Sequence, residues 1–141
     1  MLTRLKVSGF KNLEETEVRF GPLTCIAGYN GVGKSNLFDA IRFLSLLADH
    51  TFVDAAMKTR GGTSGDVAAL FRQGGNGEMR FECDILIPRR GFDDFRQLAE
   101  ATHSLLTYSL RLKLVRDQRG LERIELADED LRFVRQSEVK D

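Results

Sequence analysis

The feature that most constrains this chain is the glycine-rich stretch GYNGVGKSN, which runs from Gly28 to Asn36. Gly28, four intervening residues, and then Gly33, Lys34 and Ser35 match the pattern G-x-x-x-x-G-K-[ST]. In that pattern the backbone amides of a loop between a strand and a helix converge on phosphate oxygens. The alternative is a tight strand-to-helix turn with a solvated lysine, so the residues on either side have to be examined.

Both flanks have the expected character. Leu23 to Ala27 is a short continuous apolar run, typical of a strand buried on both faces in a parallel sheet. After the loop, SNLFDAIRFLSLLADH has apolar residues at helical spacing and predicts a helix from Ser35 to His50 that its neighbours largely cover. We therefore interpret the stretch as a nucleotide-binding loop of the Walker A type, at residues 28–35.

Each residue type in the loop has a chemical role. Glycines permit a close backbone approach, and the amides from about Gly31 to Asn36 point at the same anion as the positive end of the helix. Lys34 would place its charge between the β- and γ-phosphates, and the Ser35 hydroxyl would ligate Mg²⁺. ATP is favoured over GTP because the sequence contains no Asn-Lys-x-Asp element. The predicted nucleotide-binding residues of this stretch are Gly28, Asn30, Gly31, Val32, Gly33, Lys34, Ser35 and Asn36.

Alternating apolar residues predict an antiparallel sheet around this unit. The expected strands are Leu2–Val7, Glu14–Phe20, Met79–Ile87, Leu106–Leu114 and Leu121–Leu126, the last two joined by a turn near Gln118 to Gly120. His50 to Gly77 predicts a surface loop with one helical turn at Val67 to Phe71, and Asp93 to Ala101 predicts a short helix capped by Asp93 or Asp94. The fold class is therefore α/β, with a mixed sheet and an antiparallel β subdomain.

Composition excludes several other classes. Lys plus Arg and Asp plus Glu both total 21, so no bulk positive charge indicates nucleic acid. No apolar run approaches the roughly 20 residues of a membrane helix, and no signal peptide is visible, so we expect no membrane partner and a cytoplasmic location. Cys25 and Cys83 lie in apolar runs and are expected to be buried, reduced thiols.

The first fifty residues closely resemble the start of the ABC-type ATPase heads of the RecF, Rad50 and SMC families and of the related overcoming-lysogenization-defect and anti-phage ATPases. The shared features are GFKN after a first strand, FGPL after a second, a Walker A loop with Asn30, and SNLFDAI opening the helix. The resemblance implies a P-loop NTPase fold, with Lys11 and Asn12 close to the phosphates and Arg60 near the base. A glutamine that contacts Mg²⁺ and the attacking water would be Gln136 or Gln73.

In such proteins two heads sandwich ATP, and hydrolysis drives a conformational change. The resemblance therefore implies a second head as partner, a link to DNA repair or antiviral defence, and a nuclease or toxin effector. A Walker B strand and a signature loop are not found, and IELADED is expected to be a solvated turn. We expect residues 1–141 to be the N-terminal lobe of a longer ATPase, and hydrolysis only in the complete head. A nucleotide-sensing module without turnover and a P-loop phosphotransferase are the alternatives.

Overall fold

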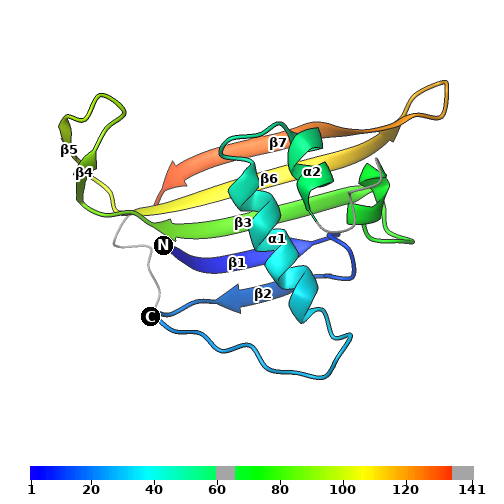
Figure 1. The fold of residues 1–141 in the computed structure, drawn as a ribbon, viewed down its shortest axis with the longest axis horizontal. Coiled ribbons are helices and arrows are strands. Elements are labelled where there is room, and N and C mark those ends of the chain that lie inside the picture. The colour runs from blue at the N-terminus through cyan, green and yellow to red at the C-terminus, as the bar shows by residue number, and fades with distance from the viewer. Residues whose placement is uncertain (60–65, 135–141) are drawn as a thin grey trace.

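The computed structural model describes residues 1–59 and 66–134. Its centre is a five-stranded sheet in the order β2-β1-β3-β6-β7 (Figure 1). The strands are β1 (Leu2–Ser8), β2 (Thr16–Arg19), β3 (Glu78–Leu86), β6 (Leu105–Arg116) and β7 (Glu122–Phe133). Every neighbouring pair is antiparallel. The expected mixed sheet is therefore wrong for the described residues, whose sheet has no parallel pair.

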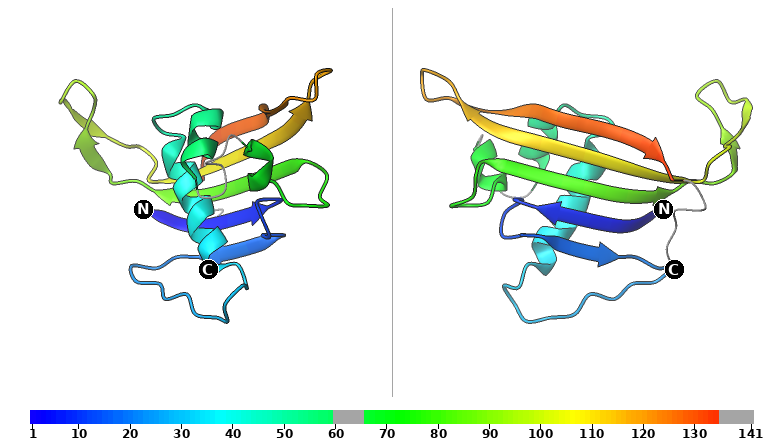
Figure 2. Two further views of the ribbon diagram at one scale, coloured as in Figure 1. Left: turned by 45° about the vertical axis from the view of Figure 1, so that its right-hand side comes forward. Right: turned by 180° about the vertical axis from the view of Figure 1, so that it is seen from behind.

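One face of the sheet carries the helices. The helix α1 (Lys34–Leu46) crosses this face diagonally, with α2 (Phe52–Lys58) beside it on the same side (Figures 1 and 2). A short 3-10 turn, η1 (Val67–Leu70), also contributes buried residues. The rings of Phe10, Phe43 and Phe81 lie 5.7 to 6.0 Å apart between their centroids. The core thus lies between α1 and the sheet, and it holds α1 directly against β1 and β3.

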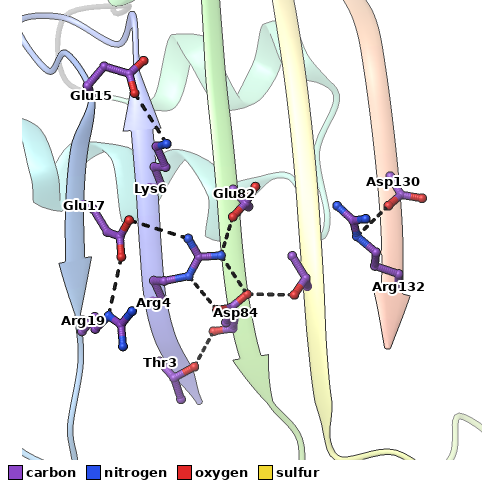
Figure 3. Close-up of polar contacts among 11 residues, drawn as sticks. Thr3, Arg4, Lys6, Glu15, Glu17, Arg19, Glu82, Asp84, Asp130 and Arg132 are labelled. Carbon is purple, nitrogen blue, oxygen red and sulfur yellow. Dashed lines mark hydrogen bonds and ion pairs between the residues drawn. The ribbon is translucent and has the colours of Figure 1, made fainter. Parts of the chain in front are cut away.

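The other face of the sheet is polar, because successive side chains of a strand point to opposite faces. Arg4 pairs with Glu82 and Asp84 there, with 2.6 Å between Arg4 Nε and Asp84 Oδ2 (Figure 3). Thr107 Oγ1 donates a further hydrogen bond to the Asp84 carboxylate at 2.8 Å. Burial alone would raise the pKa of Asp84, but the hydrogen bonds from Arg4 and Thr107 outweigh it and lower the pKa. This network joins the three central strands.

Most of the periodicity-based predictions are confirmed. The hairpin β1–β2, the helix α1, the turn η1 and strands β3 and β6 lie where the alternation and spacing placed them. The β6–β7 turn is closed by the Asp117 carboxylate, which accepts from the amides of Arg119 and Leu121. Cys83 is buried as expected, and burial raises its pKa to about 12.

The predicted strand from Leu23 to Ala27 is wrong. This segment has no regular structure and forms an extended loop outside the sheet, below β2 in Figure 1. Leu23 is 92% exposed, and Cys25 is exposed rather than buried. A strand buried on both faces needs a partner strand and covering helices, and none of the described residues supplies them to this segment.

Three further expectations need correction. The surface loop after His50 contains α2, whose start is capped when Thr51 Oγ1 accepts from the Asp54 amide. The helix expected at Asp93 to Ala101 is instead a small hairpin of β4 (Arg90–Phe92) and β5 (Leu98–Glu100), because the Asp93 carboxylate accepts from the Phe95 and Gln97 amides and makes a turn. The acidic run IELADED is not a turn but belongs to β7, where it pairs with β6.

Candidate phosphate-binding site

The start of α1 presents a polar backbone surface. Gly33 is the N-cap residue, with φ 105° and ψ 4°, and it carries no side chain that could accept from the first-turn amides. The described helix also has no acidic residue in its first turn. Leu37 is the first residue of α1 whose amide donates a helical hydrogen bond, which reaches the Gly33 carbonyl oxygen at 2.9 Å. The amides before it and the positive end of the helix dipole are therefore aimed outward, which suits an anion.

The glycine-rich loop forms a hollow at this end of α1. The hollow has a volume of about 330 Å³, within the range of small-molecule sites. It is lined by Asn30, Gly31, Gly33, Lys34, Ser35 and Asn36. The structure thus brings together six of the eight residues that the motif predicted. The other two, Gly28 and Val32, lie close together, since a Cβ added at Gly28 would lie 3.1 Å from Val32 Cγ2.

The Lys34 side chain folds over this loop. Its ammonium donates to the carbonyl oxygens of Gly28 and Tyr29, with 2.6 Å between Nζ and the Tyr29 oxygen. Lys34 is only partly exposed, and its charge therefore lies beside the loop rather than out in solvent. A cation in this place can pair with a phosphate group bound on the loop amides.

The turn between β1 and β2 packs against the other side of the loop. Asn36 Nδ2 donates to Asn12 Oδ1 at 2.7 Å. A Cβ added at Gly33 would lie 3.1 Å from Asn12 Oδ1 and 3.2 Å from Leu13 Cδ2, so a side chain there would crowd the turn. The family resemblance implied that Lys11 and Asn12 lie near the phosphates, and the structure puts Asn12 in contact with the glycine-rich loop.

Lys11 takes a different position from Asn12. Its Nζ atom lies 2.6 Å from Oδ2 of Asp39, and each of the two side chains is 12% exposed. Asp39 belongs to the second turn of α1 and is buried beside Leu37 and Ala40. The sequence reasoning did not identify Asp39 as a site residue. The available signal was a carboxylate on the apolar face of a helix, where an acid is rarely buried without a partner.

The turn itself is held by its neighbours. Gly9 has φ 76°, and a Cβ at this position would lie 2.0 Å from the carbonyl oxygen of Glu78. The amide of Lys11, which has φ 50°, donates to the Leu70 carbonyl at 2.8 Å. Strand β3 and turn η1 therefore fix the turn that contacts the loop.

A second hollow, of about 390 Å³, opens beside the same turn. Lys11 and Asn12 line it together with Ala69, Phe71, Arg72 and Gln73. Arg72 pairs with Glu14 at 2.6 Å. Gln73, one of the two glutamines that the resemblance indicated, therefore lines the hollow beside the turn that contacts the glycine-rich loop. Arg60 and Gln136 lie outside the described residues.

Magnesium has one candidate protein ligand here. Within residues 1–59 and 66–134, no three His, Cys, Asp or Glu side chains are grouped so as to hold a metal ion. Ser35 lines the hollow at the loop, and its hydroxyl is a suitable hard oxygen ligand. Mg²⁺ commonly binds through one or two protein ligands, substrate phosphates and water, so Ser35 fits as one of them.

A family model and several curated proteins match the N-terminal part of the chain. The family model described as "AAA domain" matches residues 4–85. The chain is 42% identical over 52 residues to the DNA replication and repair protein RecF of Phocaeicola vulgatus, covering 36% of this chain and 14% of that protein. It is 45% identical over 51 residues to the RecF of Parabacteroides distasonis, again covering 36% of this chain and 14% of that protein.

A third relative is the RecF of Magnetococcus marinus, which is 53% identical over 45 residues, covering 31% of this chain and 12% of that protein. The chain therefore spans only a small part of the length of the curated relatives it matches.

Among the described helices, none is long and apolar enough to cross a membrane.

Proposed function

Because the chain belongs to the AAA-domain family, we propose that it is the ATP-binding N-terminal lobe of an ABC-type ATPase of the RecF kind. The observation that carries this proposal is the hollow at the start of α1, which is lined by residues of the motif. On this view all of residues 1–141 belong to one lobe. The likeness to RecF over the first part of the chain supports the assignment.

The loop would bind the triphosphate mainly through its backbone. The amides around Gly31 to Asn36 donate to the phosphate oxygens, and the Lys34 ammonium exchanges its carbonyl partners for the β- and γ-phosphates. Ser35 supplies a hydroxyl to Mg²⁺, which neutralises charge on the phosphates when bound. Asn12, Lys11 and Gln73 line the second hollow, beside the turn that contacts the loop.

Hydrolysis and its use belong to the complete head in this proposal. A second head would close over the nucleotide, and opening after hydrolysis would move an attached partner. RecF relatives are named as DNA replication and repair proteins, so DNA is the partner we propose first. An antiviral role with a nuclease or toxin effector, and a cytoplasmic location, remain predictions from the sequence resemblance.

The test is ATP binding by the full-length protein, measured by titration calorimetry. Lys34→Ala removes the charge beside the loop and should weaken ATP binding about 100-fold, the effect of losing one strong charge-assisted hydrogen bond. Lys6→Ala is the matched control, because Lys6 is a partly exposed lysine on the opposite face of the sheet. It should leave the affinity and the melting temperature unchanged.

Unchanged ATP affinity in Lys34→Ala would refute the proposed phosphate site. Phosphate release by the full-length protein, measured with and without DNA, tests the rest of the proposal. Tight ATP binding without any release would identify a nucleotide sensor instead. Release that depends on a small-molecule acceptor would identify a phosphotransferase.

A further inference from the structure

A buried ion pair ties the phosphate-loop helix to the sheet. Asp39 of α1 and Lys11 of the β1–β2 turn are 28 residues apart, and 2.6 Å separates Lys11 Nζ from Asp39 Oδ2. With each side chain only 12% exposed, water screens the two charges little. Removing one of them would leave the other charge buried without this partner, which is costly.

The ion pair is one of three contacts along a single stripe of α1. Gly33, Asn36 and Asp39 follow one another at intervals of three residues, so they lie on the same side of the helix. Gly33 packs against Asn12 and Leu13, and Asn36 donates to Asn12 at 2.7 Å. Asp39 pairs with Lys11. Three consecutive residues of the β1–β2 turn, Lys11 to Leu13, therefore contact the start of α1.

These contacts begin at the hollow and end beneath it. Gly33 and Asn36 line the hollow, whereas Asp39 lies one turn further along the helix and does not line it. The position of the loop amides relative to the sheet then depends on how firmly α1 is held along this stripe. Asp39 supplies the one charged contact of the three.

We propose that Asp39 is a positioning residue of the phosphate site. By holding Lys11 it docks the start of α1 on the β1–β2 turn and so fixes where the amides before Leu37 point. This inference rests on the proposed function and assigns Lys11 the role of a structural tie rather than of a phosphate ligand.

The alternative is that Lys11 contacts the phosphates directly, as the sequence resemblance implied. The two roles predict opposite signs for Asp39→Asn. If Lys11 is a ligand, Asp39 competes with phosphate for it, and the isosteric amide should leave ATP binding unchanged or make it tighter. If Lys11 is a tie, the same substitution loosens the helix and should make ATP binding weaker.

The experiment uses the full-length protein and measures ATP affinity and the kinetics of phosphate release. We expect Asp39→Asn and Lys11→Met each to weaken ATP binding about 10- to 100-fold, the cost of a small displacement of binding groups. The double variant should bind ATP no more weakly than the weaker-binding single variant, because each single substitution already removes the same contact. Lys11→Arg keeps the ion pair and should stay close to the wild type. Asp49→Asn, an exposed acid just beyond the same helix, is the matched control and should have no effect.

A readout without nucleotide tests the tie by itself. Hydrogen exchange of the amides from Leu37 to Ala40 should be faster in Asp39→Asn than in the wild type, whereas Lys11→Arg, which keeps the ion pair, should retain the slow exchange of the wild type. Tighter or unchanged ATP binding in Asp39→Asn, unchanged exchange, or additive effects in the double variant would each overturn the proposal. The Lys34→Ala comparison separates this failure from failure of the proposed function, because it tests ATP binding on the loop directly.

Discussion

The two sides of the phosphate loop differ in how they are held. On the helix side, the β1–β2 turn contacts Gly33, Asn36 and Asp39 of α1 and its N-cap. Strand β3 and η1 hold this turn in place. On the strand side, Leu23 is 92% exposed and Tyr29 is 89% exposed. No strand within the described part of the chain pairs with Leu23 to Ala27. The start of α1 is therefore held by contacts within the described residues, whereas the approach to the loop is not.

The largest effect should come from the core beneath the helix side. Phe43→Ala removes a fully buried ring that packs between Phe10 and Phe81, and it should lower the free energy of unfolding by about 3–5 kcal/mol. Phe38→Ala is the control on the same helix, because Phe38 is 58% exposed. Its cost should stay below about 1 kcal/mol. Urea unfolding measures both, and similar losses would mean that α1 is not docked as described.

The second effect compares two glycines of the loop itself. Gly33 and Gly31 both have positive φ, at 105° and 89°, but only Gly33 has neighbours within 4 Å of an added Cβ. Gly33→Ala should cost about 2–3 kcal/mol from strain and crowding, and Gly31→Ala about 1 kcal/mol from strain. Thermal unfolding in the absence of nucleotide measures the difference. Equal costs would show that the turn does not press on Gly33.

A smaller effect on stability is expected from Asp84, on the polar face of the sheet. Asp84 has a lowered pKa, so its stabilising contribution is present above the ordinary carboxyl value of 3.8 and is lost as the pH falls through the folded pKa. Asp84→Asn should cost about 1 kcal/mol at neutral pH. Between pH 5 and pH 2 the variant should then lose less stability than the wild type. An equal loss across that range would exclude Asp84 as a source of the acid sensitivity.

The smallest effect on stability is expected on the strand side. Cys25 is exposed and Cys83 is buried, with a pKa raised to about 12 by burial. Iodoacetamide at neutral pH should therefore modify Cys25 first, and Cys83 only after unfolding. Cys25→Ser should change the free energy of unfolding by less than about 0.5 kcal/mol. Mass spectrometry of the labelled peptides measures the order, and protection of Cys25 would show that the strand side is covered after all.

Local patterns account for the parts that the sequence predicted well. The helix after the glycine-rich stretch and the alternation in β3 and β6 each depend on residues close together in the chain. The failures depend on neighbours that no local pattern names. Leu23 to Ala27 is apolar enough for a buried strand, but burial needs partner strands. Asp93 can cap a helix or close a turn, and its two amide partners belong to a turn.

The tie between Lys11 and Asp39 shows the same limit at the candidate site. The resemblance indicated Lys11, and the helical phase could have indicated Asp39 as a buried acid. That the two side chains meet follows from the packing of α1 on the β1–β2 turn, which brings together residues 28 positions apart. Sequence alone predicted the residues of the loop but not what holds them in place.

The most direct test of the account is hydrogen exchange of the full-length protein with and without Mg-ATP. We expect nucleotide to slow exchange most strongly in the peptide covering Gly31 to Leu37, where the loop amides would donate to phosphate. Hydrogen exchange in strand β6 should not change. Saturation with ATP without any slowing between Gly31 and Leu37 would contradict the central claim that this loop binds the phosphates.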